Sequence, residues 1–333
     1  MFGAGAMGGL LGGRLAHAGA DVGLIARGAH LAAMRADGLT IVTPTERGED
    51  SLRTKVVATD EPAELGPQDV VIVAVKGQGL LRVAEQIAPL LHGDTAVVTA
   101  MNGIPYWYFH AHEAPWAGRV VESVDPGGRI LRLIEPHRAI GCVLYPAAEI
   151  VSPGVVRHVF SNRLQIGEPD GSRSARALAF ADALDGAGFE VEVRPRIRDD
   201  IWIKLWGNLC FNPISTLTGA TLEEIVADPA TRALGRQIML EAEAVAKALG
   251  VRFHLNVDER IEMAGSVGAH KTSMLQDLEH GRPLEIDAMG TVVQEFAGLV
   301  GLPTPTLDMV LSLLRQRAAT AGCLAGATAT GAP

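Results

Sequence analysis

The 333-residue chain has few cysteines, few aromatic residues and no long apolar run. Its three cysteines, Cys142, Cys210 and Cys323, are far apart and show no CxxC spacing, which argues against a disulfide framework and a zinc site. Since no apolar run reaches the roughly 18 residues of a membrane span, no transmembrane helix is expected. The first residues lack the basic and apolar regions of a secretion signal. We therefore expect a cytoplasmic protein.

Basic residues are also scarce relative to acidic ones. Lys and Arg total 29 against 38 Asp and Glu, a net charge of −9 that disfavours nucleic acid or anionic membrane as a partner. Apolar residues are abundant at 48%, as is glycine at 38 residues, whereas charged residues make up 20%. This composition excludes global disorder and suits an α/β protein of two domains with many tight turns.

Short β-rich runs alternate with helical stretches over residues 1–194, which predicts a Rossmann-type, doubly wound parallel sheet. The clearest of these strand-like runs are residues 21–26, 69–75 and 95–99. Three later runs, at 139–145, 154–160 and 163–166, are joined by the turn signals Pro153-Gly154 and Ser161-Asn162. We expect them to extend the sheet in antiparallel fashion.

The pattern becomes helical from residue 199 onward, with apolar residues at helical spacing in 232–249 and 287–300. This predicts an all-α domain over residues 195–317, joined to the first domain at Arg194-Pro195-Arg196. The tail at 318–333 is mostly Ala, Gly and Thr without periodicity, so we expect it to be disordered.

A glycine-rich turn opens the chain. Gly3, Gly5 and Gly8 form a GxGxxG that includes Ala6 and Met7 and leads into an amphipathic helix. In a dinucleotide-binding fold these glycines permit the tight turn, the approach of the pyrophosphate and close helix packing, and the helix N-terminus binds the phosphates. The strand that should precede the turn is reduced to Met1-Phe2. A misassigned start or a trimmed sequence is the explanation we favour.

The second strand ends in Arg27, where an NAD enzyme usually carries Asp or Glu. An arginine can bind the 2′-phosphate of NADP, so NADP is the expected cofactor, although a solvated surface arginine is the alternative. Two other strands end near Lys76 and Asn102. Strand C-termini line the ligand crevice of such a sheet, so both are cleft candidates. Each is equally compatible with a surface residue or a turn former.

Lys204, Asn208 and Asn212 recur every four residues and share one face of a predicted helix. Because apolar residues flank this stripe, we expect it to be buried or to line a cleft, where a lysine can donate a proton near neutrality. A polar stripe that only ties helices together is the alternative. Pro213 should kink or stop the helix beside Asn212.

A second polar segment covers residues 270–287. Its Ser273 could form a capping box with Gln276, and Glu285 could stabilise a helix start, so both have structural readings beside a functional one. His110 and His112 form only an isolated pair, and no metal site is expected.

Taken together, these motifs resemble the ketopantoate reductases (2-dehydropantoate 2-reductases) in order and spacing from Gly3 to about Arg315. The resemblance implies an NADPH-binding domain that faces an all-helical domain across a cleft, and reduction of 2-dehydropantoate to pantoate in pantothenate biosynthesis. It also implies roles for single residues. Lys204 resembles the general acid, Glu285 the carboxylate that orients lysine and substrate, and Arg27 the 2′-phosphate ligand; Asn208, Asn212 and Ser273 resemble substrate ligands, and Lys76 and Asn102 resemble cleft residues near the nicotinamide.

The chain departs from the family after Asn102-Gly103, where it reads Ile104-Pro105-Tyr106-Trp107-Tyr108-Phe109. These aromatics either pack the following helix against the sheet or reshape the cleft beside the nicotinamide. The preferred substrate could therefore be a different 2-oxo acid, reduced on the same scaffold. A non-catalytic NADP sensor is a further alternative, and the oligomeric state, a homodimer included, stays open.

Overall fold

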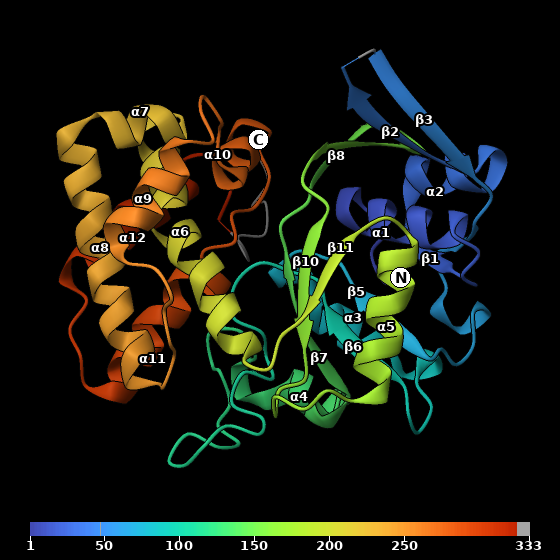
Figure 1. Ribbon diagram of the computed structural model, residues 1–333, viewed down its shortest axis with the longest axis horizontal. Coiled ribbons are helices and arrows are strands. Elements are labelled where there is room, and N and C mark those ends of the chain that lie inside the picture. Colours follow the sequence, from blue (N-terminus) through green and yellow to red (C-terminus); the bar gives the residue numbers. More distant parts are fainter. Residues whose placement is uncertain (47, 325–333) are drawn as a thin grey trace, which may run out of the picture. The chain divides into compact units, whose positions relative to one another are not determined.

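The computed structural model describes residues 1–46 and 48–324, which form two compact units (Figure 1). The first unit comprises residues 1–120 and 127–197, and the second comprises residues 121–126 and the chain from Arg198 onward. In the second unit the Glu295 carboxylate accepts hydrogen bonds from the backbone N–H groups of Glu122 (2.9 Å) and Ser123 (2.8 Å). The sequence had placed this short segment in the N-terminal domain.

The secondary structure follows the predicted change from mixed to helical. The strands are β1 Gly23–Ile25, β2 Leu39–Thr45, β3 Gly48–Thr54, β4 Val57–Thr59, β5 Val70–Val73, β6 Ala96–Thr99, β7 Ala139–Leu144, β8 Ala147–Ser152, β9 Val155–Phe160, β10 Arg163–Gly167 and β11 Glu190–Val193. The helices are α1 Ala6–His17, α2 Gly28–Asp37, α3 Leu80–Gln86, α4 Arg129–Leu133, α5 Ala175–Gly186, α6 Ile197–Thr218, α7 Leu222–Ala227, α8 Pro229–Ala248, α9 Val257–Gly265, α10 Ser273–Glu279, α11 Val292–Val300 and α12 Pro305–Thr320.

The main sheet is completed at its centre by the first two residues. Phe2 forms parallel bridges to Ile25 of β1 and to Val73 of β5, so it joins the pair β4–β1 to the strands β5–β6–β7–β10–β11. Its N–H donates to the Ile72 carbonyl at 2.7 Å, and its carbonyl accepts from Ala74 N–H at 2.9 Å. The predicted doubly wound α/β fold is confirmed, and the slot that a reduced first strand would leave is occupied by Met1-Phe2 itself.

A second sheet corrects part of the prediction. Among the described residues it has the order β3–β2–β9–β8. β10 extends the main sheet antiparallel to β7, as expected, but β9 leaves that sheet and pairs with β8 and, in parallel, with β2. Gly154, at φ +78°, makes the turn between β8 and β9. The expected single antiparallel extension is wrong because the partner of β9 comes from residues 40–42, far away in the sequence.

Helix α1 is packed between the two sheets by two pairs of glycines. A Cβ added to Gly12 would lie 2.5 Å from Leu24 Cδ2 of the main sheet, and one added to Gly8 would overlap the turn before the helix. On the opposite side, a Cβ on Gly9 would lie 2.9 Å from Val156 Cγ2, and one on Gly13 2.8 Å from Ile41 Cδ1. Real Cβ atoms do not approach this closely, so both helix faces need glycine.

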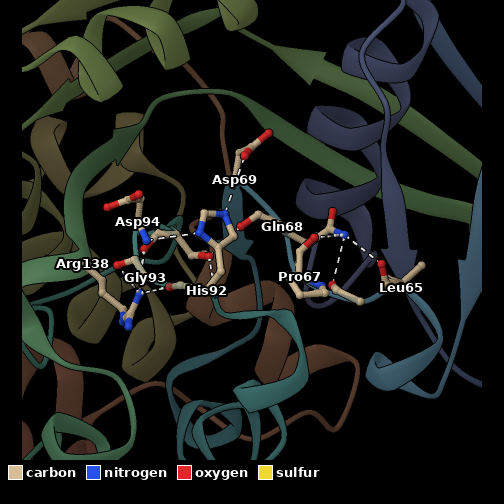
Figure 2. A network of polar contacts seen from close by, with 10 residues as sticks. Leu65, Pro67, Gln68, Asp69, His92, Gly93, Asp94 and Arg138 are labelled. Carbon is tan, nitrogen blue, oxygen red and sulfur yellow. Dashed lines mark hydrogen bonds and ion pairs between the residues drawn. The ribbon is translucent and has the colours of Figure 1, made fainter.

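A polar network fastens the ends of β5 and β6 that lie opposite the glycine turn (Figure 2). The Gln68 amide donates to the carbonyls of Leu65, Gly66 and Pro67 at 3.0–3.2 Å. The Arg138 guanidinium donates to the carbonyl of His92 at 2.6 Å, and the His92 ring lies 3.6 Å from Asp69 Oδ1. These bonds satisfy loop carbonyls and fix where the two strands start.

The segment after Asn102, where the sequence departs from the family pattern, belongs to the hydrophobic core. Tyr106, Trp107, Tyr108 and Phe109 are each at most 1% exposed. The Trp107 indole donates to Thr99 Oγ1 of β6 at 3.1 Å, and its ring lies where a side chain on Gly141 would be. The packing interpretation is therefore confirmed for Trp107, although turns rather than a helix follow directly. This burial favours packing over the alternative, that Tyr106 or Trp107 reshapes a substrate cleft, which stays a prediction.

The helical unit extends further than predicted. Helix α12 continues to Thr320, Ala318 and Cys323 are buried, and the Cys323 carbonyl accepts from Leu284 N–H at 2.9 Å. The predicted disorder is thus wrong for 318–324, and the rest of that tail, 325–333, lies outside the described residues. No helix in the described part of the chain is long and apolar enough to span a membrane.

Candidate active site

The glycine turn places an uncapped helix N-terminus at one edge of the main sheet. Gly3 has φ +95°, and Gly5 is the N-cap of α1 without a side-chain cap or an acidic residue in the first turn. A Cβ on Gly5 would meet no atom within 4 Å, unlike those on Gly3 and Gly8. The N–H groups of Ala6 and Met7 therefore begin a helix beside open space, which suits an anionic ligand.

Three predicted cleft residues follow strands that end at this same edge. Arg27 lies two residues after β1 and is the N-cap of α2; it is exposed, and its guanidinium makes no hydrogen bond or ion pair within the described residues. Lys76 follows β5 and Asn102 follows β6, and these two strands are paired in parallel. Carboxyl ends of neighbouring parallel strands lie together, so the fold brings the three residues and the glycine turn to one side.

His30 of α2 is a neighbour of this turn that the sequence did not reveal. Its Nδ1 accepts a hydrogen bond from Gly154 N–H at 2.9 Å, which ties α2 to the β8–β9 turn. Its Nε2 is buried without a hydrogen-bond partner in the described residues. Burial lowers the pKa of the imidazole, and the Ala4 carbonyl of the glycine turn opposes this in part.

The predicted polar stripe lies on α6, a helix of 22 residues. Lys204 and Asn208 are half-buried, whereas Asn212 is 4% exposed. The side-chain amide of Asn212 donates to Met289 Sδ at 3.8 Å, and its backbone carbonyl accepts from Thr216 Oγ1 at 2.7 Å. The stripe is thus partly accessible at Lys204 and Asn208 and lies in the core at Asn212, whose hydrogen bonds tie α6 to Met289 and to its own next turn.

Pro213 does not stop α6, which continues to Thr218. Proline removes the N–H that would bond to the Leu209 carbonyl, and helices tolerate this when packing holds them. Trp202 and Trp206 are fully buried on the same helix, and the Trp206 indole donates to the Met239 carbonyl of α8 at 2.7 Å. Of the expected kink or stop beside Asn212, the stop is wrong because tertiary packing holds the helix together across Pro213.

Ser273 is not a helix cap. Thr272 is the N-cap of α10 and accepts from Leu275 N–H at 3.3 Å, while the Gln276 amide donates to the Lys271 carbonyl. The Ser273–Gln276 capping box is therefore wrong. Ser273 is exposed at the first position of α10, which leaves the functional interpretation of its hydroxyl.

Glu285 lies on a loop that is held on its N-terminal side. Arg282 donates to the carboxylate of the buried Asp277 at 2.8 Å, and Leu284 N–H donates to Cys323. Glu285 is half-buried between Leu284 and Ile286, which are both buried. It precedes the π-helical turn Asp287–Thr291, whose N-cap is Ile286. The loop anchors therefore fix the place of this carboxylate.

A small cavity brings the two polar segments together. Its volume is about 10 Å³, which is room for roughly one water molecule. Asn208, Leu209 and Pro213 of α6 form one wall, and the others are formed by Met274, Ile286, Met289, Gly290, Leu311 and Leu314. Met274 follows Ser273, and Ile286 follows Glu285. The Asn208 side of α6 therefore borders the two segments that carry Ser273 and Glu285. The roles of these side chains stay predictions.

Arg260 of α9 lies on the other flank and was missed by the sequence analysis. A Cβ on Gly207 would lie 2.6 Å from its Cζ and 3.2 Å from its Nε, so the guanidinium rests against the backbone of α6. The available signal was Gly207 itself. A glycine inside a long helix costs about 1 kcal/mol relative to alanine, which usually indicates a close approach.

Residues 1–171 match the family described as Ketopantoate reductase PanE/ApbA, and residues 196–318 match its C-terminal part. The chain belongs to the ketopantoate reductase family. The predicted family is thus confirmed, and with it the predicted class of enzyme, an oxidoreductase that acts on a ketone.

Similar ketopantoate reductases cover nearly the whole chain. A 2-dehydropantoate 2-reductase of Mesorhizobium japonicum is 53% identical over 97% of this chain and 98% of its own. The crystal structure of a candidate ketopantoate reductase from Ralstonia solanacearum is 44% identical, with a TM-score of 0.90 over 96% of this chain and 97% of that one. A 2-dehydropantoate 2-reductase structure from Geobacter metallireducens is 29% identical, with a TM-score of 0.81 over 95% and 98%.

Proposed function

We propose that this ketopantoate reductase family member reduces 2-dehydropantoate to pantoate with NADPH, a step of pantothenate biosynthesis, and that Lys204 is its general acid. The observation that carries the proposal is the arrangement on α6. Lys204 and Asn208 lie on one helix face, and the flank of Asn208 borders the segments of Ser273 and Glu285. The name of the relative from Mesorhizobium japonicum, 2-dehydropantoate 2-reductase, supports this substrate.

The first unit fits a dinucleotide with a 2′-phosphate. Open space at Gly5 lets a pyrophosphate approach the N–H groups of Ala6 and Met7, which carry the positive end of the α1 dipole. Arg27 is exposed and can bind a phosphate bidentately. When bound, NADPH supplies the hydride for the ketone carbon. Lys76 and Asn102, after the adjacent strands β5 and β6, are proposed to line the same side.

Lys204 supplies the proton. As the ketone becomes an alcohol, negative charge develops on its oxygen, and an ammonium placed there stabilises the charge and then transfers a proton to it. The neutral lysine takes a proton from solvent before the next turnover. Glu285 is proposed to orient the ammonium, and Asn208 and Ser273 to bind the substrate. One N–H of the Asn212 amide donates to Met289, and its second N–H is proposed to bind the substrate.

The test is the oxidation of NADPH with 2-dehydropantoate and a panel of other 2-oxo acids. In Lys204→Ala we expect turnover to fall by about 100-fold or more, the usual effect of a positioned acid, with NADPH affinity near that of the wild type. Lys271→Ala is the matched control, because this exposed lysine pairs with Glu279; it should keep normal turnover. Near-normal turnover in Lys204→Ala would refute the general acid, and a better 2-oxo acid in the panel would change the substrate.

A cytoplasmic location and a homodimer also belong to the proposal. Met309 and Leu313, one helical turn apart on α12, are 63% and 60% exposed. Neighbouring exposed apolar side chains of this kind favour association. Sedimentation of the purified protein measures the oligomeric state directly.

A further inference from the structure

The small cavity beside Asn208 has almost entirely apolar walls. Six of its nine lining residues are leucine, isoleucine or methionine, and within the described part of the chain Asn208 supplies the one polar side chain of the lining. Pro213 has no N–H, and the N–H of Gly290 donates to the Ile286 carbonyl at 2.7 Å. A buried water needs about two to four polar partners, so this space suits a small apolar group better than a water molecule.

A glycine in the π-helical turn Asp287–Thr291 keeps the cavity open. A Cβ added to Gly290 would lie 2.6 Å from Cδ2 and 2.9 Å from Cδ1 of Leu311, which is part of the cavity wall. Gly290 does not have a positive φ, so the glycine is needed for space and not for the shape of the turn. An alanine there would displace the end of the leucine, and the free space beside that leucine is the cavity.

The cavity adjoins the helix face that carries the proposed general acid. Asn208 follows Lys204 by four residues, so their side chains are neighbours on α6. In a 2-oxo acid, C3 is bonded to the ketone carbon, and a methyl branch on C3 lies only a few ångströms from the ketone oxygen. A substrate with its ketone oxygen at Lys204 and a contact to Asn208 therefore brings a branch on C3 within reach of the cavity.

We propose that the cavity receives a methyl branch on C3 of the 2-oxo acid, and that Gly290 thereby determines a preference for branched over unbranched acids. This inference rests on the proposed function and specifies the class of substrate. The cavity has room for roughly one water molecule, which is close to the size of a methyl group. Met274 and Met289 also line it, and flexible methionine side chains adapt to the shape of such a group.

The experiment compares 2-oxobutanoate with 3-methyl-2-oxobutanoate, which differ by one methyl branch on C3, at saturating NADPH. We expect the wild type to favour the branched acid in kcat/KM by about 10-fold or more, the usual effect of a methyl group in an apolar pocket. In Gly290→Ala the displaced leucine fills the cavity, so this preference should fall by about 10-fold. Both constants come from one preparation, so a loss of folded protein cancels in their ratio.

Gly298→Ala is the matched control for Gly290→Ala. Gly298 is exposed on α11, and a Cβ there would meet no atom within 4 Å. This variant should keep the wild-type preference for the branched acid.

A second variant enlarges the cavity and keeps the test decisive if Gly290→Ala does not fold. Ile286→Val removes one methyl group from the wall, a mild change for a core. It should raise kcat/KM for 3,3-dimethyl-2-oxobutanoate relative to 3-methyl-2-oxobutanoate by about fourfold, the effect of one buried CH₂. Ile261→Val makes the same change at a buried position of α9 outside the cavity wall and should not alter this ratio.

The outcomes separate this inference from the proposed function. An unchanged preference in an active Gly290→Ala, or in Ile286→Val where Gly290→Ala does not fold, overturns this inference alone. A wild type that reduces branched and unbranched acids equally well does the same. A wild type that reduces no 2-oxo acid overturns the proposed function and this inference with it.

Discussion

Helices α1 and α6 both depend on glycines, but the glycines serve opposite purposes. In α1 they admit other parts of the fold: Gly12 meets Leu24 of one sheet and Gly9 meets Val156 of the other. In α6 the single Gly207 admits a charged side chain. In the proposed function, α1 binds the cofactor through its backbone N–H groups, whereas α6 acts on the substrate through the side chains of Lys204 and its neighbours.

This difference decides what each region tolerates. A site built from backbone groups loses binding or stability when a Cβ is added in the wrong place. The atoms that this Cβ would touch predict which of the two is lost. A site built from side chains fails when a functional group is removed, even if the helix is unchanged. The two kinds of damage can be separated experimentally within a single motif.

The largest effects are expected from two alanine substitutions in the glycine turn. In Gly8→Ala the Cβ would overlap the Gly3 carbonyl and lie 3.2 Å from Ala74 Cβ; overpacking against backbone should lower the free energy of unfolding by about 3 kcal/mol. In Gly5→Ala the Cβ meets no protein atom within 4 Å. Stability should therefore fall by no more than about 1 kcal/mol, the cost of alanine at an N-cap, while NADPH affinity falls roughly 100-fold because the Cβ enters the proposed pyrophosphate position.

Thermal or chemical unfolding and fluorescence titration with NADPH measure the two effects separately. Equal destabilisation by both substitutions would show that Gly5 is a packing glycine like Gly8. An unchanged NADPH affinity in Gly5→Ala would place the pyrophosphate elsewhere.

A comparable effect is expected at Arg27, the proposed ligand of the cofactor's 2′-phosphate. Arg27→Asp removes a charge-assisted contact and adds repulsion of the 2′-phosphate, so NADPH binding should weaken by about 2–4 kcal/mol more than NADH binding. Lys55→Asp makes the same change of charge at another exposed position of this unit and should affect both cofactors little. Equal losses for NADPH and NADH in Arg27→Asp would place this arginine outside the phosphate site.

The sequence predicted best what depends on short stretches of chain. The glycine turn and the Lys204–Asn208 spacing could be read because a turn and a helix face are local, and the order of the parallel strands followed from their alternation with helices. The second sheet could not be predicted, because its polar strand β3 shows no strong alternation of apolar and polar residues and β9 pairs with a strand about 115 residues earlier.

The same reason explains the residues that were missed. Arg260 belongs to a polar surface helix, and only its position opposite Gly207 distinguishes it from Arg236. No sequence signal distinguishes His30 from other helix residues, because its role depends on the contact with Gly154 of the β8–β9 turn. Pro213 predicted a kink or a stop of the helix, and packing prevents the stop. In each case a long-range contact decides the outcome.

The smallest effect concerns His30, where a side chain supports the backbone-built region. The Gly154 N–H donates to Nδ1, so this nitrogen must be unprotonated in the folded protein. Burial lowers the pKa of His30 below its ordinary value of 6.5. The unfolded chain therefore binds a proton at a higher pH than the folded one. The stability that His30 contributes is complete above about pH 6.5 and is lost as the pH falls below it.

We expect His30→Gln to reduce this acid sensitivity, because glutamine can still accept from Gly154 N–H but does not titrate. The free energy of unfolding should fall less between neutral and mildly acidic pH in the variant than in the wild type, by up to about 1 kcal/mol per pH unit. His17→Gln, at an exposed position in α1, should leave the wild-type pH dependence unchanged. If His30→Gln and the wild type lose stability in parallel, the hydrogen bond to Gly154 does not hold α2 against the second sheet, and the glycines of α1 carry that packing without it.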